Sequence, residues 1–292
     1  MRAVDSLFFV LVMLIWGVNF VVTKVALYEV PPLLLVTLRF GAVTLLVAPF
    51  VRIPWEKVRQ LLPLSITLGS LHFSLMFIGL TRLDAATAAL TVQIQVPVAA
   101  LLAAIFLGDR LGWRRLVGMA IAFAGVAIIA GEPRLAGNYL PLLLVIAASC
   151  LWATANIQIK FLGEIDALTL NAALALFATP QLALASLLLE DGQWSALTAA
   201  SWRLYASVAY QALAVTVMGY GLWYHLLRRY KVNQVMPFTL LVPLFGVLSG
   251  VTFLDERLTV AIMLGGALTV LGVAIITVRR PALAERSAKG GL

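Results

Sequence analysis

Ten long apolar stretches follow one another along the 292 residues of the chain, and they constrain its fold more than any other feature. Each contains about 20 residues, the length at which a helix crosses the hydrocarbon core of a bilayer. Backbone groups inside lipid find no hydrogen-bond partner outside their own segment, so each stretch is expected to be helical. The sequence therefore predicts an all-α membrane protein with ten transmembrane helices. The predicted spans are 5–28, 32–51, 60–80, 84–107, 113–130, 138–162, 166–189, 201–227, 232–254 and 259–278.

The composition agrees with a lipid environment and excludes a soluble globular domain. Hydrophobic residues make up 62% of the chain and charged residues 12%, which is too little charge to coat a soluble core of this size. The formal net charge of +8 does not indicate nucleic-acid binding, because the charges lie between the apolar stretches and not in one basic patch. Lipid is the expected partner, and nucleic acid is not.

Metal, cofactor and redox chemistry find no support in the sequence. Cys150 is the single cysteine and lies inside an apolar stretch, so an internal disulfide is impossible and a packing role is favoured. His72 and His225 come from different predicted spans and lack the spacing of metal ligands. All acidic residues lie at span ends or in loops, so no catalytic set converges within the membrane. The sequence predicts no cofactor, no metal site and no enzymatic activity.

Basic residues in the short loops predict the orientation. If the N-terminus is cytoplasmic, most of the 21 Lys and Arg residues fall on the cytoplasmic side, as the positive-inside rule requires. Both termini are therefore expected in the cytoplasm, with the basic tail at 279–292 lying against anionic lipid. Lys24 and Lys160 lie near the ends of their spans and are expected to extend toward the lipid headgroups.

The junction before the fifth span occurs twice. Phe-Leu-Gly-Asp-Arg-Leu at 106–111 is matched by Phe-Leu-Asp-Glu-Arg-Leu at 253–258, and Gly-Val-Ala-Ile-Ile occurs at both 125–129 and 272–276. Five spans are thus duplicated, as 1–131 and 138–278. Because five is odd, the second copy enters the membrane from the opposite side, which makes an inverted-topology repeat. Two such halves can expose one central site to either side in turn, so the pattern indicates transport by alternating access.

These features together resemble one known family. Trp16 and Trp152 lie near the middle of the first span of each half, Arg39 lies in the second span, and a proline lies in the fourth span of each half, before the repeated junction. The pattern is similar to EamA-type members of the drug/metabolite transporter superfamily over nearly the whole chain. The resemblance implies a bacterial inner-membrane exporter of small metabolites, with amino-acid exporters, including aromatic amino-acid exporters, among its members. Arg39 departs from the repeat, because Ala175 occupies the matching position in the seventh span.

Polar and aromatic side chains in mid-span are the candidates for a substrate site, because lipid offers them no partner and they therefore face the bundle interior. Amides supply donors and acceptors for a zwitterion, and Trp and Tyr supply ring faces. Each residue also has a structural alternative, namely helix packing, bonding to its own backbone or, for Tyr220, an interfacial aromatic belt. The predicted substrate-binding residues are Trp16, Asn19, Arg39, His72, Gln95, Trp152, Asn156 and Tyr220. Pro97 and Pro243 are predicted to kink their helices, either as hinges or gates or only to set helix shape.

The predicted function is export of amino acids, aromatic or neutral, or of similar small metabolites. The middle of the first span, 14–19, contains no carboxylate, so a facilitator without proton coupling is favoured, although His72 could titrate near neutral pH. Two alternatives stay open: an exporter of hydrophobic or cationic drugs, and a non-transporting membrane scaffold or sensor subunit. The sequence does not choose between a monomer and a homodimer.

Overall fold

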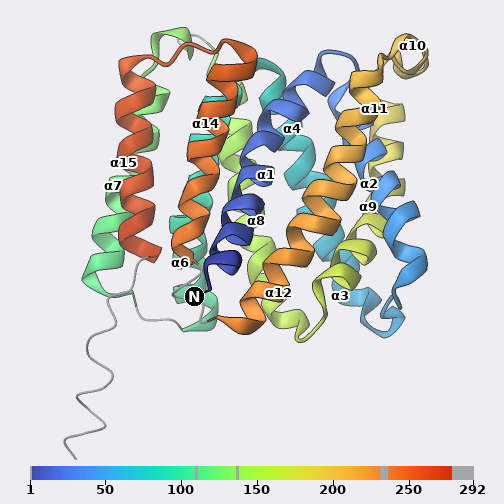
Figure 1. Ribbon diagram of the computed structural model, residues 1–292, viewed down its shortest axis with the longest axis horizontal. Coiled ribbons are helices and arrows are strands. Elements are labelled where there is room, and N and C mark those ends of the chain that lie inside the picture. The colour runs from blue at the N-terminus through green and yellow to red at the C-terminus, as the bar shows by residue number, and fades with distance from the viewer. Residues whose placement is uncertain (1, 109–110, 136–137, 231–235, 278–292) are drawn as a thin grey trace, which may run out of the picture.

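The protein is a bundle of roughly parallel helices, described here by a computed structural model that covers residues 2–108, 111–135, 138–230 and 236–277 (Figure 1). Within those ranges every regular element is helical, which confirms the all-α prediction. Residues 109–110, including Arg110 of the repeated junction, and the predicted basic tail lie outside the described residues. The α-helices are α1 (Ala3–Leu27), α2 (Pro32–Val47), α3 (Val58–Leu64), α4 (Phe73–Arg82), α5 (Ala85–Thr91), α6 (Gln95–Leu107), α7 (Trp113–Ala130), α8 (Leu140–Leu162), α9 (Ala167–Leu189), α10 (Gln193–Ala199), α11 (Trp202–Ala209), α12 (Gly221–Arg229), α14 (Leu241–Leu254) and α15 (Val260–Thr277).

Eight helical stretches in the described residues are long and apolar enough to cross a membrane. They coincide with the first seven predicted spans and the tenth, with ends that differ by a few residues. Of the other two, 201–227 corresponds to α11, the π-helical segment η6 (Tyr210–Tyr220) and α12, which follow one another without a break. The ninth corresponds to a shorter apolar helix, Phe238–Leu254. The chain is thus a multi-pass membrane protein, and the number of ten spans stays a prediction.

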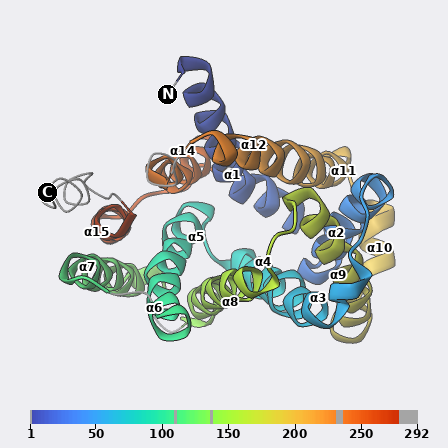
Figure 2. The same ribbon diagram turned by 90° about the horizontal axis from the view of Figure 1, so that it is seen from below.

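The helices are arranged in two rows (Figure 2). One row contains α14, α1 and the α11–α12 helix, and the other contains α5–α6, α8 and α3–α4. In the first row α1 packs on α14 and η6, and in the second α8 packs on α6 and α4. The pair α7–α15 closes one end of the rows and the pair α2–α9 closes the other. Helices that hold the same place in the order of the two predicted halves therefore pack against corresponding neighbours.

Interruptions of the α-helices also fall at corresponding places in the two halves. The third predicted span of each half contains a π-helical segment, η3 (Ser65–His72) in one and η6 in the other. A 3₁₀ segment, η4 (Val92–Ile94) or η7 (Met236–Leu240), precedes the helix with the buried Pro97 or Pro243. Each proline is the third residue of its α-helix, where a missing N–H is tolerated. The hinge or gate role of these prolines stays a prediction.

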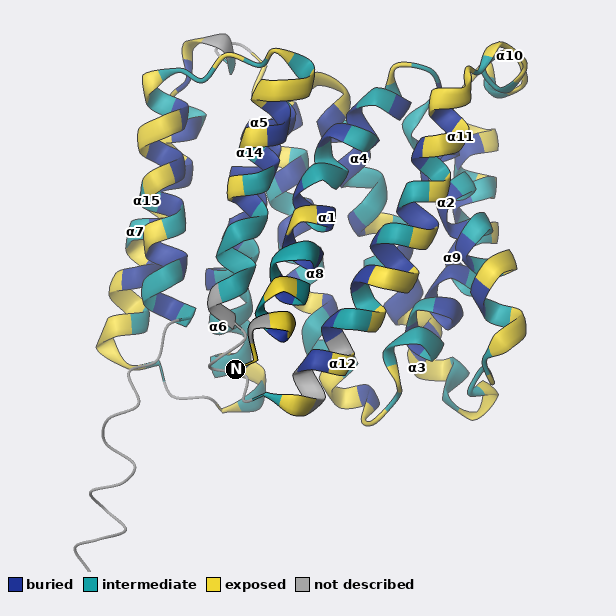
Figure 3. Cartoon of the chain, viewed as in Figure 1, coloured by how far each residue is buried: buried dark blue, intermediate teal, exposed yellow. Residues whose placement is uncertain are grey.

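Both described ends of the chain lie on one side of the bundle, called here the lower side as in Figure 1, where α1 begins and α15 ends. The opposite, upper side contains α10 and the connection between α14 and α15. Exposed residues are frequent on the outward faces of the helices, and buried residues gather between the helices (Figure 3). Large apolar side chains such as Leu45, Ile105 and Leu187 are exposed, as expected for a surface that meets lipid.

Four glycines bring the backbones of α7 and α15 into contact. A Cβ atom on Gly265 would lie 2.6 Å from the carbonyl oxygen of Gly125, and one on Gly272 would lie 2.5 Å from the carbonyl oxygen of Gly118. These are the glycines that the repeat places at matching positions in the two halves. Small residues allow such close approach, on which helix association in lipid depends.

Gly265→Ala is predicted to separate these two helices and to lower the free energy of unfolding by about 1–3 kcal/mol, the range of an overpacked contact. Thermal unfolding of the purified protein in detergent measures the effect. Gly221→Ala is the matched control, because a Cβ atom there would meet nothing within 4 Å. Equal melting temperatures for the two variants would contradict the close packing of α7 on α15.

Candidate functional site

Most of the buried polar atoms without a hydrogen-bond partner in the described residues belong to the first row and to α2. Native structures leave few such atoms, so each calls for an explanation. They belong to Trp16, Asn19 and Thr23 on α1, Arg39 on α2, Gln158 on α8 and Gln211 on η6. Trp16, Asn19 and Thr23 lie three and four residues apart and therefore share one face of α1. This face of α1, Arg39 and the π-helical segment η6 form the candidate substrate site.

Arg39 is the charged centre of this candidate site. It is buried, with 4% of its surface exposed, and Nε is one of the unpartnered atoms. The guanidinium carbon lies 4.5 Å from the centre of the Phe73 ring and 5.8 Å from that of Phe40. Tyr220 and His72 both lie close enough to interact electrostatically with Arg39. Arg39, His72 and Tyr220, which come from three predicted spans, are thus brought together.

Trp16 connects this group to the aromatic residues of the α11–α12 helix. Its ring centre lies 5.2 Å from that of Tyr220 and 5.5 Å from that of Trp223. The close approach requires Gly219, since a Cβ atom there would lie 2.7 Å from Nε1 of Trp16. Tyr220 thus packs inside the bundle, which favours a wall of the site over an interfacial belt.

His72 is fixed by the backbone of the second row. Its Nδ1 lies 2.7 Å from the carbonyl oxygen of Ala148, so Nδ1 carries the proton and donates it. The imidazole also makes an edge contact with Phe73, with ring centres 4.7 Å apart. His72 therefore joins η3 to α8 and holds Phe73 beside Arg39.

The remaining predicted residues do not join this group by any contact seen in the structure. Asn156 donates to the carbonyl oxygen of Trp152 in its own helix, at 2.7 Å, which is the local alternative considered above. Trp152 and Gln95 are half-buried. The substrate-binding roles of all three stay predictions.

Gln211 and Thr23 belong to the candidate site although neither is among the predicted binding residues. Gln211 is completely buried, and both polar atoms of its side chain lack a partner. It lies in η6, where a π-helical turn changes the direction of successive side chains, so a spacing of 3.6 residues does not indicate its face. A buried glutamine in an apolar stretch is the signal that identifies it.

The two rows are held together at the upper side by two charged residues. Lys24 is buried and donates to the carbonyl oxygens of Leu80, at 3.0 Å, and of Leu83, at the end of α4. The expectation that Lys24 extends to the headgroups is therefore wrong, because the unsatisfied carbonyls of a helix end are nearer partners than water. Glu256 follows α14 and accepts from the amides of Ala85 and Ala86, at 2.6 and 2.8 Å.

Burial raises the pKa of the Glu256 carboxyl, while the amides of Ala86 and Ala85 and the charge of Lys24 oppose the rise. Glycines bring the helices together next to this contact, since a Cβ atom on Gly246 would lie 2.5 Å from that of Ala89. We call the contacts of Lys24, of Glu256 and of α5 with α14 the upper seam. It joins the two rows at the upper side.

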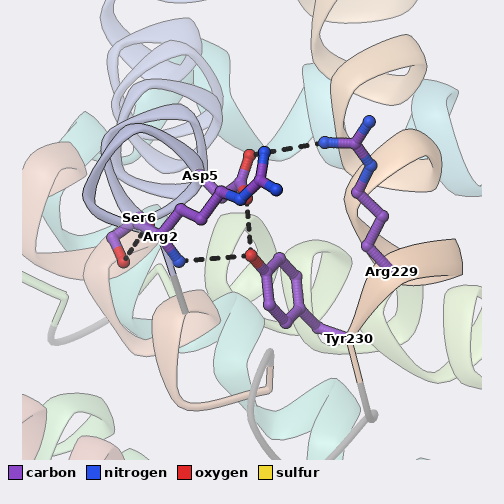
Figure 4. Close-up of polar contacts among 5 residues, drawn as sticks. All are labelled: Arg2, Asp5, Ser6, Arg229 and Tyr230. Carbon is purple, nitrogen blue, oxygen red and sulfur yellow. Dashed lines mark hydrogen bonds and ion pairs between the residues drawn. The ribbon is translucent and has the colours of Figure 1, made fainter.

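The lower side differs from the upper side. Within the described residues, α6 does not pack on α14 as α5 does above it. Lys160, which matches Lys24 in the repeat, is exposed and makes no hydrogen bond to a described residue. Contacts at the lower side instead join helices of one row: the Tyr230 hydroxyl donates to Asp5 and accepts from the backbone amide of Arg2, while Arg229 lies 3.8 Å from Asp5 (Figure 4).

Lys24→Met is predicted to lower the melting temperature, because two carbonyl oxygens at the end of α4 lose a charged donor. Hydrogen bonds to charged groups contribute about 1.5–3 kcal/mol each, and thermal unfolding in detergent measures the loss. Lys160→Met serves as the matched control and is expected to change stability by less than about 0.5 kcal/mol, as is usual for surface positions. Equal losses in the two variants would indicate that neither lysine is part of a seam.

Comparisons with known proteins agree with a membrane transporter. The model of the EamA-like transporter family matches the chain twice, at residues 5–131 and 140–278. Two relatives, each described as a probable amino-acid metabolite efflux pump, from Escherichia coli (strain K12) and Salmonella typhimurium (strain LT2), are 34% identical over 93% of this chain and 94% of their own length. A probable terminal-alkyne amino-acid exporter of Streptantibioticus cattleyicolor is 29% identical over 92% of both chains. A solved crystal structure, 20% identical, shares the fold, with a TM-score of 0.62 over 95% of this chain and 97% of the other.

Proposed function

The chain belongs to the EamA-like transporter family, and on that basis we propose that it exports amino acids, aromatic or neutral, or similar small metabolites. The observation that carries the proposal is the 34% identity, over nearly the full length, to relatives described as amino-acid metabolite efflux pumps. The candidate site supports the same class of cargo. The site combines unpartnered hydrogen-bond donors and acceptors with the rings of Trp16 and Tyr220. An amino acid needs donors for its carboxylate and acceptors for its ammonium group. An apolar side chain additionally needs an apolar surface such as a ring face.

We propose further that the two halves are inverted repeats. The double match to the family model, the corresponding helix neighbours and the corresponding interruptions support this arrangement. The turn after the fourth span adds to it, because Gly108 and Asp255, at matching positions, both have a left-handed backbone, with φ of 69° and 52°. Glycine adopts this conformation most readily, and aspartate is one of the few other residues that adopt it comparatively often.

Alternating access is the mechanism that we propose for the two halves. In the proposed cycle, the state with the upper side closed is the one in which Lys24 bonds to the end of α4. In the opposite state the lower side would close instead, and Lys160 would take the place of Lys24. Its acceptors would be the carbonyl oxygens of Leu227 and Tyr230 at the end of α12, which match those of Leu80 and Leu83. The cargo would reach the same site from the lower side in one state and from the upper side in the other.

The proposed location is the inner membrane of a bacterium, with both termini in the cytoplasm. The two described ends of the chain lie on the lower side, where most of the basic residues were expected, which supports this orientation. The lower side is then the cytoplasmic side in the proposed orientation.

Impermeant maleimide labelling of intact cells tests the inverted repeat. Trp113 and Val260 are the first residues of α7 and α15, occupy matching positions and are both exposed. In a cysteine-free Cys150→Ala background, the Val260→Cys variant is expected to react in intact cells, and the Trp113→Cys variant only after permeabilisation. Labelling of both variants from the same side would rule out inverted halves.

Counterflow in proteoliposomes tests the cargo. Labelled phenylalanine and leucine are expected to exchange saturably, and an Asn19→Ala or Trp16→Ala variant should exchange more slowly than an Arg203→Gln variant, whose arginine is exposed on α11. Exchange of lipophilic cations without amino acids would identify a drug exporter. No exchange of any solute by folded protein, and no effect of the site variants, would favour a scaffold or sensor.

We also propose that exchange is not driven by protons. In the described part of the chain, the carboxylates lie in the first turn of α1, at the start of the third span or outside the spans, so none is available at the middle of the membrane to carry a proton. A steep dependence of counterflow on an imposed pH gradient would contradict this.

A further inference from the structure

Arg39 places a full positive charge in the interior of the bundle without an obvious counterion. Its guanidinium is buried, and within the described residues no carboxylate forms an ion pair with it. Leaving a charge uncompensated in such a place is costly, so intramembrane arginines normally pair with another group. Within the part of the chain that the structure describes, Arg39 therefore has no charged partner.

The surroundings of Arg39 compensate for its charge only in part. Phe73 and Phe40 offer ring faces, which attract a guanidinium, but a ring does not accept the in-plane N–H bonds. Tyr220 lies near, yet a neutral phenol does not cancel a charge. Within the described residues the guanidinium donates no hydrogen bond, and its buried Nε lacks a partner, so the N–H donors at its edge are left for another ligand. That edge, a planar fork of N–H donors, fits the two oxygens of a carboxylate.

The same region offers no matching anion for an ammonium group. Its unpartnered acceptors are neutral, namely the amide oxygens of Asn19 and Gln211 and the hydroxyl oxygen of Thr23. The second half has no charged residue at the position that matches Arg39, because that position is Ala175. The candidate site is therefore one-sided: a charged partner for a carboxylate and only neutral partners for an ammonium.

We propose that Arg39 binds the carboxylate of the cargo and that this contact defines the cargo class. The class comprises small carboxylates with an aromatic or other apolar group, and a free ammonium is dispensable. The inference deepens the proposed function and rests on it, since amino acids are one kind of such carboxylate. It adds that N-acylated amino acids are also cargo, whereas amines and amides of the same shape are not.

Competition on the unmodified protein tests the class. Proteoliposomes exchange labelled phenylalanine in the presence of unlabelled N-acetylphenylalanine, phenylalaninamide or phenylethylamine. N-acetylphenylalanine, which keeps only the carboxylate, is expected to compete within a few-fold of phenylalanine. The amide and the amine, which keep only the ammonium, are expected to compete at least about tenfold more weakly, the loss of one charge-assisted contact. Competition by phenylalaninamide equal to that by phenylalanine would overturn the inference.

Variants then assign the discrimination to Arg39. In the Arg39→Gln variant, the ratio of half-inhibiting concentrations of phenylalaninamide and phenylalanine is expected to fall toward one. Arg39→Lys, which keeps the charge without the fork, should give an intermediate ratio. A merely structural role would lower the exchange rate without changing the ratio. Arg203→Gln, which removes an exposed arginine, should leave the ratio unchanged.

The outcomes separate this inference from the proposed function. If phenylalanine exchanges but carboxylate and amine compete equally, the role of Arg39 is rejected and amino-acid export stands. If phenylalanine does not exchange and lipophilic cations do, both are rejected. If the Arg39→Gln protein does not fold, the competition series on the unmodified protein still decides whether the carboxylate is the recognised group.

Discussion

A charged group that is surrounded by helices and lipid needs a partner inside the bundle. In this protein the partners of two such groups join the two rows of helices. Lys24 is paired with carbonyl oxygens at the end of α4, and Glu256 with the first amides of α5. Both contacts cross from one row of helices to the other, so they join the two rows at the upper side of the bundle. Arg39 is the exception, because its charge is buried without a counterion in the described residues. We therefore expect it to contribute most to the recognition of an anionic group in the candidate site.

Much of the fold could be predicted from the sequence because the relevant signals are local. Apolar stretches indicated where helices lie, and the repeated junction indicated which positions correspond. Gly108 and Asp255 then have the same left-handed turn, and Pro97 and Pro243 follow the same change from 3₁₀ to α-helix. Eight of the predicted spans agree with helices of sufficient length and apolarity. The sequence could not show how the helices are placed side by side, since that depends on packing between segments far apart in the chain.

The candidate site was predictable in part for the same reason. Trp16, Arg39, His72 and Tyr220 were identifiable as polar or aromatic residues in mid-span, and the structure brings them together. The partner of His72 is a backbone carbonyl, which leaves no trace in the amino-acid pattern. Gln211 lies in a π-helical segment, where helical spacing no longer predicts the face. Lys24 and Lys160 occupy matching positions in the sequence yet differ in burial, so their shared sequence context does not predict which of the two is buried.

The contact between α7 and α15 limits where movement can occur. These two helices touch through their backbones at Gly118, Gly125, Gly265 and Gly272. Sliding or rotating one helix against the other would replace glycine with a bulkier neighbour within a single turn. We therefore expect α7 and α15 to keep their positions relative to each other during the proposed transport cycle. The largest displacements should occur far from these two helices, near the pair α2–α9, which is also where Arg39 is located.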